Sequence, residues 1–460
     1  MERELVGVFG LLALLILILL RVPVALAMLV TGVVGSWVVS LVSPFLKFGP
    51  YLLQFKTALW NTVANYDLSV VPLFILMGFL AAETGLSRDL FHGMAALTRR
   101  VRGGVAMATI LACAGFGAVS GSSVATASTM SRVALPELRR LRYAETLSTG
   151  VLAAGGTLGI LIPPSVALVI YAIVVEASII QMFQAAIVPG ILAVVFFLIA
   201  IRLRVARDPS IAPPAAEMTA DEISTAIRRL LPVATIFGTI ILGLGMGLFT
   251  PTPAAAIGVF LILAYGLERR ASSADGLTWP RLRAALLSTS KTAAMIYFIL
   301  FSADILKGFF ARTGLPMALS DWAAASTLEP YAVLLVMLLA LIALGCFMES
   351  LSMILVVVPF FWPVLIELNG GDFVSAADAA FGMTTDELKI WFGILALVVV
   401  ELGLITPPVG LNVFVIKSFS PNTSLGTIFR GVAPFFAVEL LRTALLLLLP
   451  GLCLFLTRVL

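Results

Sequence analysis

The motif GGTLGILIPPS at residues 155–165 returns in altered form as ELGLITPPVGLN at residues 401–412. Each run lies inside an apolar segment of membrane-spanning length, and in each a Pro-Pro pair follows a glycine four residues earlier. Proline removes a backbone donor and clashes with the preceding helical turn, whereas glycine permits non-helical angles. We therefore predict that both helices unwind in mid-membrane, the first from the glycines of 155–159 to Pro163-Pro164. Because freed carbonyls need polar partners there, each break predicts a cavity or an ion site.

A polar turn precedes each motif, at Ser120–Ser123 and at Glu349–Ser352, inside the apolar segments 103–136 and 331–363. Each segment is too long for one simple span and too short for two spans with a loop. Arginine clusters flank both ends of the first segment, whereas acidic residues without nearby Lys or Arg flank the second. Because positive loops face the cytoplasm, both ends of each segment should lie on the same side of the membrane. We predict two re-entrant helical hairpins that enter from opposite sides.

The composition excludes an ordinary soluble protein, because 61% of the 460 residues are hydrophobic, only 12% are charged and the mean hydropathy is +1.11. Soluble domains carry about 25% charged residues. The Lys and Arg residues form short clusters between apolar runs, which orients spans and does not indicate nucleic-acid binding. We expect an all-α polytopic membrane protein with about ten transmembrane helices besides the hairpins. The predicted spans are 5–20, 23–42, 69–84, 144–173, 182–201, 231–249, 251–267, 285–310, 389–417 and 430–455.

The order span, hairpin, broken span, span occurs twice, and Thr84-Gly85-Leu86 returns as Thr313-Gly314-Leu315. The first copy starts outside and the second starts inside, so the copies are inverted and both termini lie outside. Inverted repeats with discontinuous helices are typical of secondary transporters. We predict four divisions. Residues 1–68 hold scaffold spans and an amphipathic interfacial arm (45–60), and residues 69–201 form the first repeat with its broken helix at 144–173. Residues 202–284 hold two loops (202–230 and 268–283) and the central scaffold helices, and residues 285–455 form the second repeat with its broken helix at 389–417 and a polar insertion at 369–388.

The polar atoms of these turns and breaks are hard oxygen donors, which suit a sodium ion. The chain has one histidine, and its three cysteines lie in apolar segments, so no transition-metal site and no cofactor is expected beyond sodium as the coupling ion. Glu401 is an alternative carboxylate ligand. The predicted sodium-binding residues are Ser120, Gly121, Ser122, Gly156, Thr157, Gly159, Glu349, Ser350, Gly403, Thr406 and Pro407.

The positive ends of half-helices that begin near Ser122 and Pro164 should attract a small organic anion. Charged residues inside spans are costly and by default functional. Lys291 either contacts the substrate or extends to the membrane interface, and Asp304 with Lys307 is either functional or a mutually neutralising pair. The predicted substrate-binding residues are Ser123, Pro164, Ser165, Lys291 and Asn412.

With its SGSS hairpin turn and both Pro-Pro motifs, the chain resembles the large membrane subunit (DctM-like) of tripartite ATP-independent periplasmic (TRAP) transporters over nearly its whole length. The resemblance implies an elevator mechanism driven by a sodium gradient in a bacterial inner membrane. It also implies a carboxylate substrate, such as a C4-dicarboxylate or a sugar acid, a soluble periplasmic substrate-binding protein and a small four-helix membrane subunit. Because the first span starts at about residue 5, we expect that subunit to be a separate chain.

Three alternatives remain at this point. A stand-alone sodium–dicarboxylate symporter of similar hairpin architecture would need no periplasmic partner. A channel would lack saturable, sodium-dependent accumulation. A membrane enzyme has the least support, because the sequence holds no paired catalytic carboxylates, HExxH or GxSxG, and we expect the chain not to be an enzyme.

Overall fold

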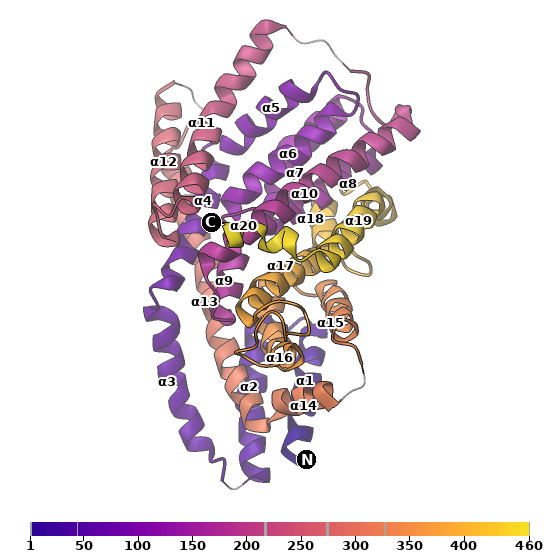
Figure 1. Ribbon diagram of the computed structural model, residues 1–460. Helices are drawn as coiled ribbons and strands as arrows, with labels where there is room; N and C mark the ends of the chain where they lie inside the picture. Colours follow the sequence, from indigo (N-terminus) through magenta and orange to yellow (C-terminus); the bar gives the residue numbers. More distant parts are fainter. Residues whose placement is uncertain (1, 44, 216–218, 273–275, 326–327, 460) are drawn as a thin grey trace.

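A computed structural model describes residues 2–43, 45–215, 219–272, 276–325 and 328–459, and the regular structure within these ranges is helical throughout (Figure 1). The α-helices are α1 Glu2–Leu19, α2 Val24–Val42, α3 Phe48–Ala64, α4 Val70–Glu83, α5 Leu86–Thr98, α6 Gly104–Ser120, α7 Ser123–Arg140, α8 Glu145–Leu161, α9 Val166–Val174, α10 Ile179–Arg207, α11 Ala220–Gly245, α12 Pro251–Ser272, α13 Trp279–Thr313, α14 Leu315–Ala325, α15 Pro330–Gly345, α16 Ser350–Asn369, α17 Thr385–Leu404, α18 Leu411–Phe419, α19 Leu425–Leu448 and α20 Gly451–Val459. Two short 3-10 helices lie at Asp67–Ser69 and Pro209–Ile211. Among the described residues, seven helices are long and apolar enough to cross a membrane, or up to nine if each bent pair counts as one span. The predicted all-α polytopic fold is confirmed.

The helix order of α4 to α10 returns in α13 to α19, so the repeat in the sequence is also a repeat in the structure. At the Thr-Gly-Leu motifs, Gly85 ends the turn after α4 and Gly314 ends the turn after α13, with left-handed φ values of 81° and 74°. Glycine adopts such angles without steric cost. In both copies the chain therefore leaves a long helix through the same turn and enters a short one.

Both predicted hairpins and both broken helices are present (Figure 1). The arms α6 and α7 meet at a tip around Gly121, and the arms α15 and α16 meet at a tip before Ser350. The helices α8 and α9 are bent by 46° at their break. The first half of each broken helix packs against both arms of the hairpin in its own repeat: α8 contacts α6 and α7, and α17 contacts α15 and α16. The second half packs on the hairpin of the other repeat, since α9 contacts α16 and α18 contacts α7. This crosswise packing brings both tips and both breaks together.

The glycines of 155–159 do not unwind the first broken helix, which corrects the prediction for that segment. α8 stays helical to Leu161, and the break is confined to 162–165. The glycines serve close packing: a Cβ on Gly117 of α6 would lie 2.6 Å from Gly159 Cα, and a Cβ on Gly403 would lie 2.6 Å from Gly345 Cα of α15. In each copy a hairpin arm thus touches the broken helix through paired glycines.

Three further boundaries differ from the sequence-based expectation. The half-helix predicted to begin near Pro164 begins at Val166. The last predicted span, 430–455, is divided at Leu449-Pro450, because Pro450 cannot continue α19, and α20 packs separately on α10 and α17. The predicted loop 202–230 is partly helical, since α10 extends to Arg207 and a capping box at Thr219 starts α11.

The remaining helices flank this hairpin assembly (Figure 1). α2 packs on α13, the first helix of the second repeat, and α12 packs on α4, the first helix of the first repeat. The first helix of each repeat is therefore covered by a helix from outside that repeat. The predicted amphipathic stretch 45–60 is the helix α3, which is largely exposed and meets the segment of α4 at a bend of 57°. The Tyr51 hydroxyl fastens it to α13 by donating to the Ile305 carbonyl at 2.8 Å.

Candidate functional site

A single carboxylate joins the tips of the two hairpins. Glu401, on the first half of the second broken helix, is only 3% exposed. Ser123 at the first tip donates to its Oε2 at 2.5 Å, and Ser350 at the second tip donates to its Oε1 at 2.9 Å. The sequence named Glu401 as an alternative ligand and preferred Glu349. The bridge could not be foreseen, because it depends on how the second repeat packs against the first hairpin.

A pocket of about 460 Å³ opens beside the tips. Its lining comes from α4, the first hairpin, the break-side ends of α8, α9 and α17, α13 and the second tip, so it contains residues of both repeats. Six predicted site residues line it: Ser120, Gly121, Ser122, Ser123, Glu349 and Ser350. The lining also contains a residue that the sequence analysis did not single out, Arg132 of α7. Its place in the pocket wall depends on how the hairpin packs on the other helices, so the sequence alone gave no signal for it.

The first tip is held by polar contacts between residues close in the sequence. Ser120 and Thr126 share a hydrogen bond between their hydroxyls at 2.8 Å. Ser122 caps α7 by accepting from the Ala125 amide at 3.4 Å. Side chains that satisfy the first amides of a helix fix its start. The tip is therefore an ordered cluster of hydroxyl oxygens at the positive end of α7.

Several predicted sodium ligands make local contacts at the breaks. The Thr157 hydroxyl donates to the Ala154 carbonyl at 2.6 Å, and the Thr406 hydroxyl donates to the Leu402 carbonyl at 2.5 Å. The Pro407 carbonyl accepts from the Cys346 thiol at 3.4 Å, beside the second tip. Gly156, Gly159 and Gly403 lie in helical segments and serve close packing.

The predicted substrate residues are distributed unevenly. Ser123 lines the pocket, whereas Pro164, Ser165 and Asn412 are buried and do not line it. Asn412 donates to the Ala153 carbonyl at 3.4 Å, but within the described chain its Oδ1 and the Ser165 Oγ have no hydrogen-bond partner. Lys291 is exposed and lies outside the lining, although its neighbours Ser288 and Thr292 line the pocket.

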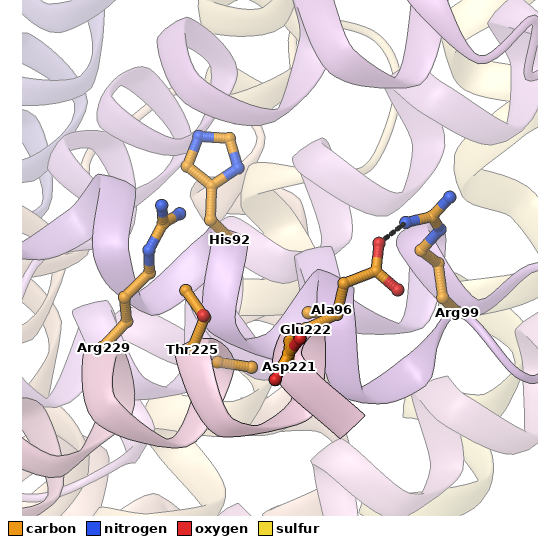
Figure 2. A pocket seen from close by; sticks show the side chains of 8 residues that line it. His92, Ala96, Arg99, Asp221, Glu222, Thr225 and Arg229 are labelled. Carbon is orange, nitrogen blue, oxygen red and sulfur yellow. Dashed lines mark hydrogen bonds and ion pairs between the residues drawn. The ribbon is translucent and has the colours of Figure 1, made fainter. Parts of the chain in front are cut away.

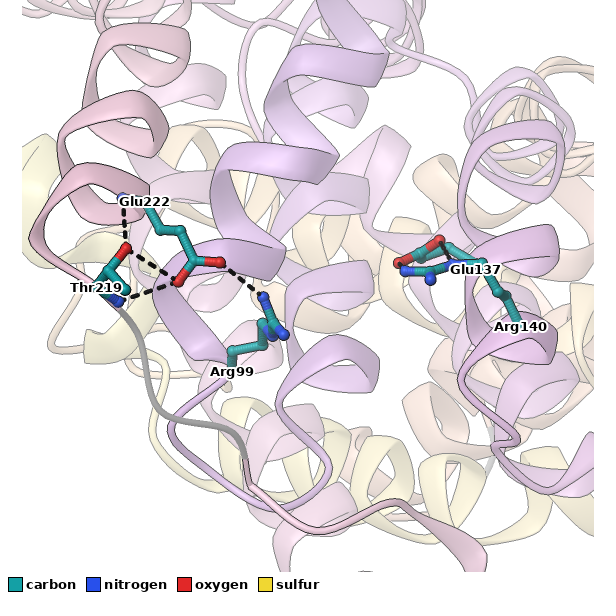
Figure 3. Close-up of polar contacts among 5 residues, drawn as sticks. All are labelled: Arg99, Glu137, Arg140, Thr219 and Glu222. Atoms are coloured by element: carbon teal, nitrogen blue, oxygen red, sulfur yellow. Dashed lines mark hydrogen bonds and ion pairs between the residues drawn. The ribbon is translucent and has the colours of Figure 1, made fainter.

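A second, smaller pocket of about 290 Å³ lies between α5 and α11 (Figure 2). Arg99 and Glu222 form an ion pair across it at 3.3 Å, and the Thr219 capping box holds Glu222 (Figures 2 and 3). Burial, followed by the charge of Arg229, lowers the pKa of the half-buried His92 from its ordinary value. Within the ranges that the structure describes, no group of three or more His, Cys, Asp or Glu residues could hold a metal ion. This pocket lies at the joint between α5 and α11, where the Arg99–Glu222 ion pair connects the two segments.

The sequence matches the family model "Tripartite ATP-independent periplasmic transporter, DctM component" over residues 11–452. It is 31% identical over 424 residues to the C4-dicarboxylate TRAP transporter large permease protein DctM of Pseudomonas aeruginosa, which covers 91% of this chain and 92% of that protein. It is 28% identical over 390 residues to the sialic acid TRAP transporter large permease protein SiaM of Vibrio cholerae (84% and 85%). The solved structure of the Alcanivorax borkumensis YdaH transporter shares the fold, with a TM-score of 0.61 at 16% identity over 87% of this chain and 89% of that one.

Proposed function

This chain belongs to the DctM component family of tripartite ATP-independent periplasmic (TRAP) transporters, and on that premise we propose that it drives sodium-coupled uptake of a small organic anion. It is a multi-pass transporter permease and not an enzyme. The relatives from Pseudomonas aeruginosa and Vibrio cholerae are named for a C4-dicarboxylate and for sialic acid. Both substrates are carboxylates, which supports a carboxylate substrate here.

The observation that carries the proposal is the Glu401 bridge between the hairpin tips. A buried carboxylate is costly unless a cation or several donors stabilise it. Ser123 and Ser350 supply two donors, and the oxygen atoms around them suit a hard monovalent cation. Sodium bound at this junction would draw both tips onto the broken helix. Anion binding and hairpin closure would then depend on the sodium concentration.

Unpartnered oxygens in the broken helices support further contacts with the coupling ion or the anion. The Oγ of Ser165 and the Oδ1 of Asn412 are buried and lack a hydrogen-bond partner among the described residues. Buried polar atoms without partners are rare, and a bound ion or ligand is one of the explanations for them. In this proposal the remaining predicted ligands, the backbones of Gly121, Gly156 and Pro407 among them, stay candidates for the coordination shell.

The packing also supports an elevator movement. The hairpins, broken helices, α10 and α19 contact one another extensively, and α2, α13, α4 and α12 form a second group in which α13 packs on both α2 and α4. In the proposed mechanism the first group moves as one body against the second. The pocket at the tips draws its lining from both groups, so that movement would expose it to alternate sides. The α5–α11 joint is one contact that such a movement has to accommodate.

We place the chain in a bacterial inner membrane with both termini on the periplasmic side. This orientation puts arginine-rich loops such as 99–102 and 139–142 in the cytoplasm, where positively charged loops usually lie. The other two components of the proposed system are a small membrane subunit and a soluble periplasmic binding protein that delivers the anion. The family's tripartite name supports both partners. The small subunit would widen the scaffold against which the hairpin group moves.

Reconstitution in liposomes tests the proposal. The chain alone, with an inward sodium gradient, should accumulate no carboxylate beyond the level of empty liposomes. Addition of the small membrane subunit and the substrate-loaded binding protein should produce saturable, sodium-dependent uptake. Strong sodium-driven uptake by the chain alone would favour the stand-alone symporter. Uptake by the full system that ignores sodium would refute the coupling.

A further inference from the structure

The pocket beside the hairpin tips has an uneven distribution of charge. Among the described residues that line it, Arg132 is the one cation, against the two carboxylates of Glu83 and Glu349. Most other polar lining groups are hydroxyls, including Ser128 and Thr129 on the same helix as Arg132. An anion that enters this pocket therefore has a single cationic side chain to bind.

The contacts of Arg132 leave it available for such an anion. Its guanidinium lies over the Phe419 ring, 5.7 Å from the centroid, and its Nη2 donates to Ser128 Oγ at 3.5 Å. No carboxylate in the described part of the chain forms an ion pair with it. Stacking on an aromatic face orients the planar group while its in-plane donors stay free. A guanidinium held in this way matches the two oxygens of a carboxylate.

The position of Arg132 on α7 separates it from the acidic tip. Arg132 lies nine positions after Ser123 on α7, which corresponds to roughly 13 Å along a helix. The tip end of the pocket contains Glu349 and the Ser350 that binds Glu401, so it disfavours a second negative charge and suits a cation. Between the two ends the wall offers hydroxyl groups. The pocket therefore has a subsite that binds an anion at Arg132, a subsite that binds a cation at the hairpin tips, and a hydrogen-bonding surface between them.

We infer that Arg132 anchors the single carboxylate of a hydroxylated monocarboxylate, a sugar-acid type of substrate, whose hydroxyls face the serine and threonine side chains of the pocket. A dicarboxylate would place its second charge against Glu83 or Glu349. This inference rests on the proposed function, because it assigns a substrate class to the same transport site. It selects one of the two carboxylate classes that the relatives represent.

The test uses the purified chain in detergent with saturating sodium chloride at pH 7 and measures binding calorimetrically. The probes are D-gluconate, its uncharged analogue sorbitol, and succinate. Gluconate should bind more tightly than succinate, and sorbitol should not bind. Arg132→Gln should weaken gluconate binding at least about tenfold, as expected for the loss of a charge-assisted contact. Arg132→Lys should recover part of the affinity, because it keeps the charge and loses the two-pronged geometry.

Arg140→Gln is the matched control, because it makes the same charge change on the same helix. Arg140 pairs with Glu137 and does not line the pocket (Figure 3). Its gluconate affinity should equal that of the unmodified chain. Tighter binding of succinate, unchanged gluconate affinity in Arg132→Gln, or no gluconate binding at all would overturn the inference. None of these results would refute sodium-coupled carboxylate uptake, which the liposome assay with other carboxylates tests independently.

Discussion

The close contact between Gly345 of the second hairpin and Gly403 of the second broken helix predicts that a single added methyl group destabilises the fold. A Cβ added to Gly403 would lie 2.6 Å from two backbone atoms of Gly345, whereas ordinary contacts lie at 3.4–4 Å. Backbone atoms cannot rotate away as a side chain can. Gly403→Ala therefore requires α15 to retreat from α17 by about 1 Å, and overpacking of this kind costs about 1–3 kcal/mol.

The control for this variant is Gly238→Ala in α11. Gly238 is also helical, but nothing lies within 4 Å of the Cβ it would gain. Both substitutions gain roughly 1 kcal/mol of helix propensity, so the difference between the two variants isolates the overpacking cost. We expect thermal unfolding in detergent, followed by tryptophan fluorescence, to show a lower midpoint for Gly403→Ala. Gly238→Ala should match or exceed the unmodified chain.

The displacement should also reach the ion site. α15 leads directly into the second tip, where Ser350 donates to Glu401 at 2.9 Å. A shift of this arm by about 1 Å would lengthen that hydrogen bond beyond a useful distance, so Gly403→Ala should raise the sodium concentration for half-maximal uptake by the reconstituted system. Equal stability of Gly403→Ala and Gly238→Ala, together with unchanged sodium dependence, would refute the close contact between α15 and α17 and its link to the ion site.

Further predictions concern topology, pH and sodium. Cysteines placed singly by Val101→Cys and Arg140→Cys should both react only with a cytoplasmic reagent, and labelling from opposite sides would mean that 103–136 is a single span. A hydrogen bond from Arg140 lowers the pKa of Glu137 below its ordinary value of 4.5, so this carboxylate stabilises the fold above that value and loses its contribution as the pH falls through the lower folded pKa. Glu137→Gln should accordingly reduce the unfolding midpoint at pH 7 and flatten its decline toward pH 3, and parallel curves for both proteins would contradict this. Ser122→Ala and Thr406→Ala should each raise the sodium concentration for half-maximal uptake, and unchanged values in both would remove them from the site.

The sequence predicts most of the architecture because its signals are strong and duplicated. Apolar runs of spanning length, arginine clusters at 99–102 and 139–142 and the two Pro-Pro motifs lead to the membrane fold, the hairpins and the breaks that the structure contains. The error at 155–159 has a physical cause. Glycine is used both for unwinding and for close approach, and only the partner helix, unknown from the sequence, distinguishes the two uses.

The site is less predictable because its members come from distant parts of the chain. The hydroxyls of the SGSS turn could be named from the sequence, and they line the pocket. The bridge from Glu401 to Ser123 depends on contact between the two repeats, which periodicity and motif spacing do not encode. Arg132 gave no signal, because an arginine on the polar face of a hairpin helix usually reads as a solvated residue. Lys291 drew attention as a charge within an apolar run, yet only its neighbours line the pocket.

The most direct test of the central claim is a sodium titration of carboxylate uptake by the reconstituted system with Glu401→Gln, beside a Glu222→Gln control. Glu222 is a carboxylate at the distant α5–α11 joint, so its variant should keep the unmodified sodium dependence. Glu401 accepts from both hairpin tips, and removal of its charge should abolish uptake or raise the half-saturating sodium concentration at least about tenfold, the factor expected when a charged ligand contact is lost. An active Glu401→Gln variant with the sodium dependence of the unmodified protein would contradict the proposal that sodium couples transport at the junction of the hairpin tips.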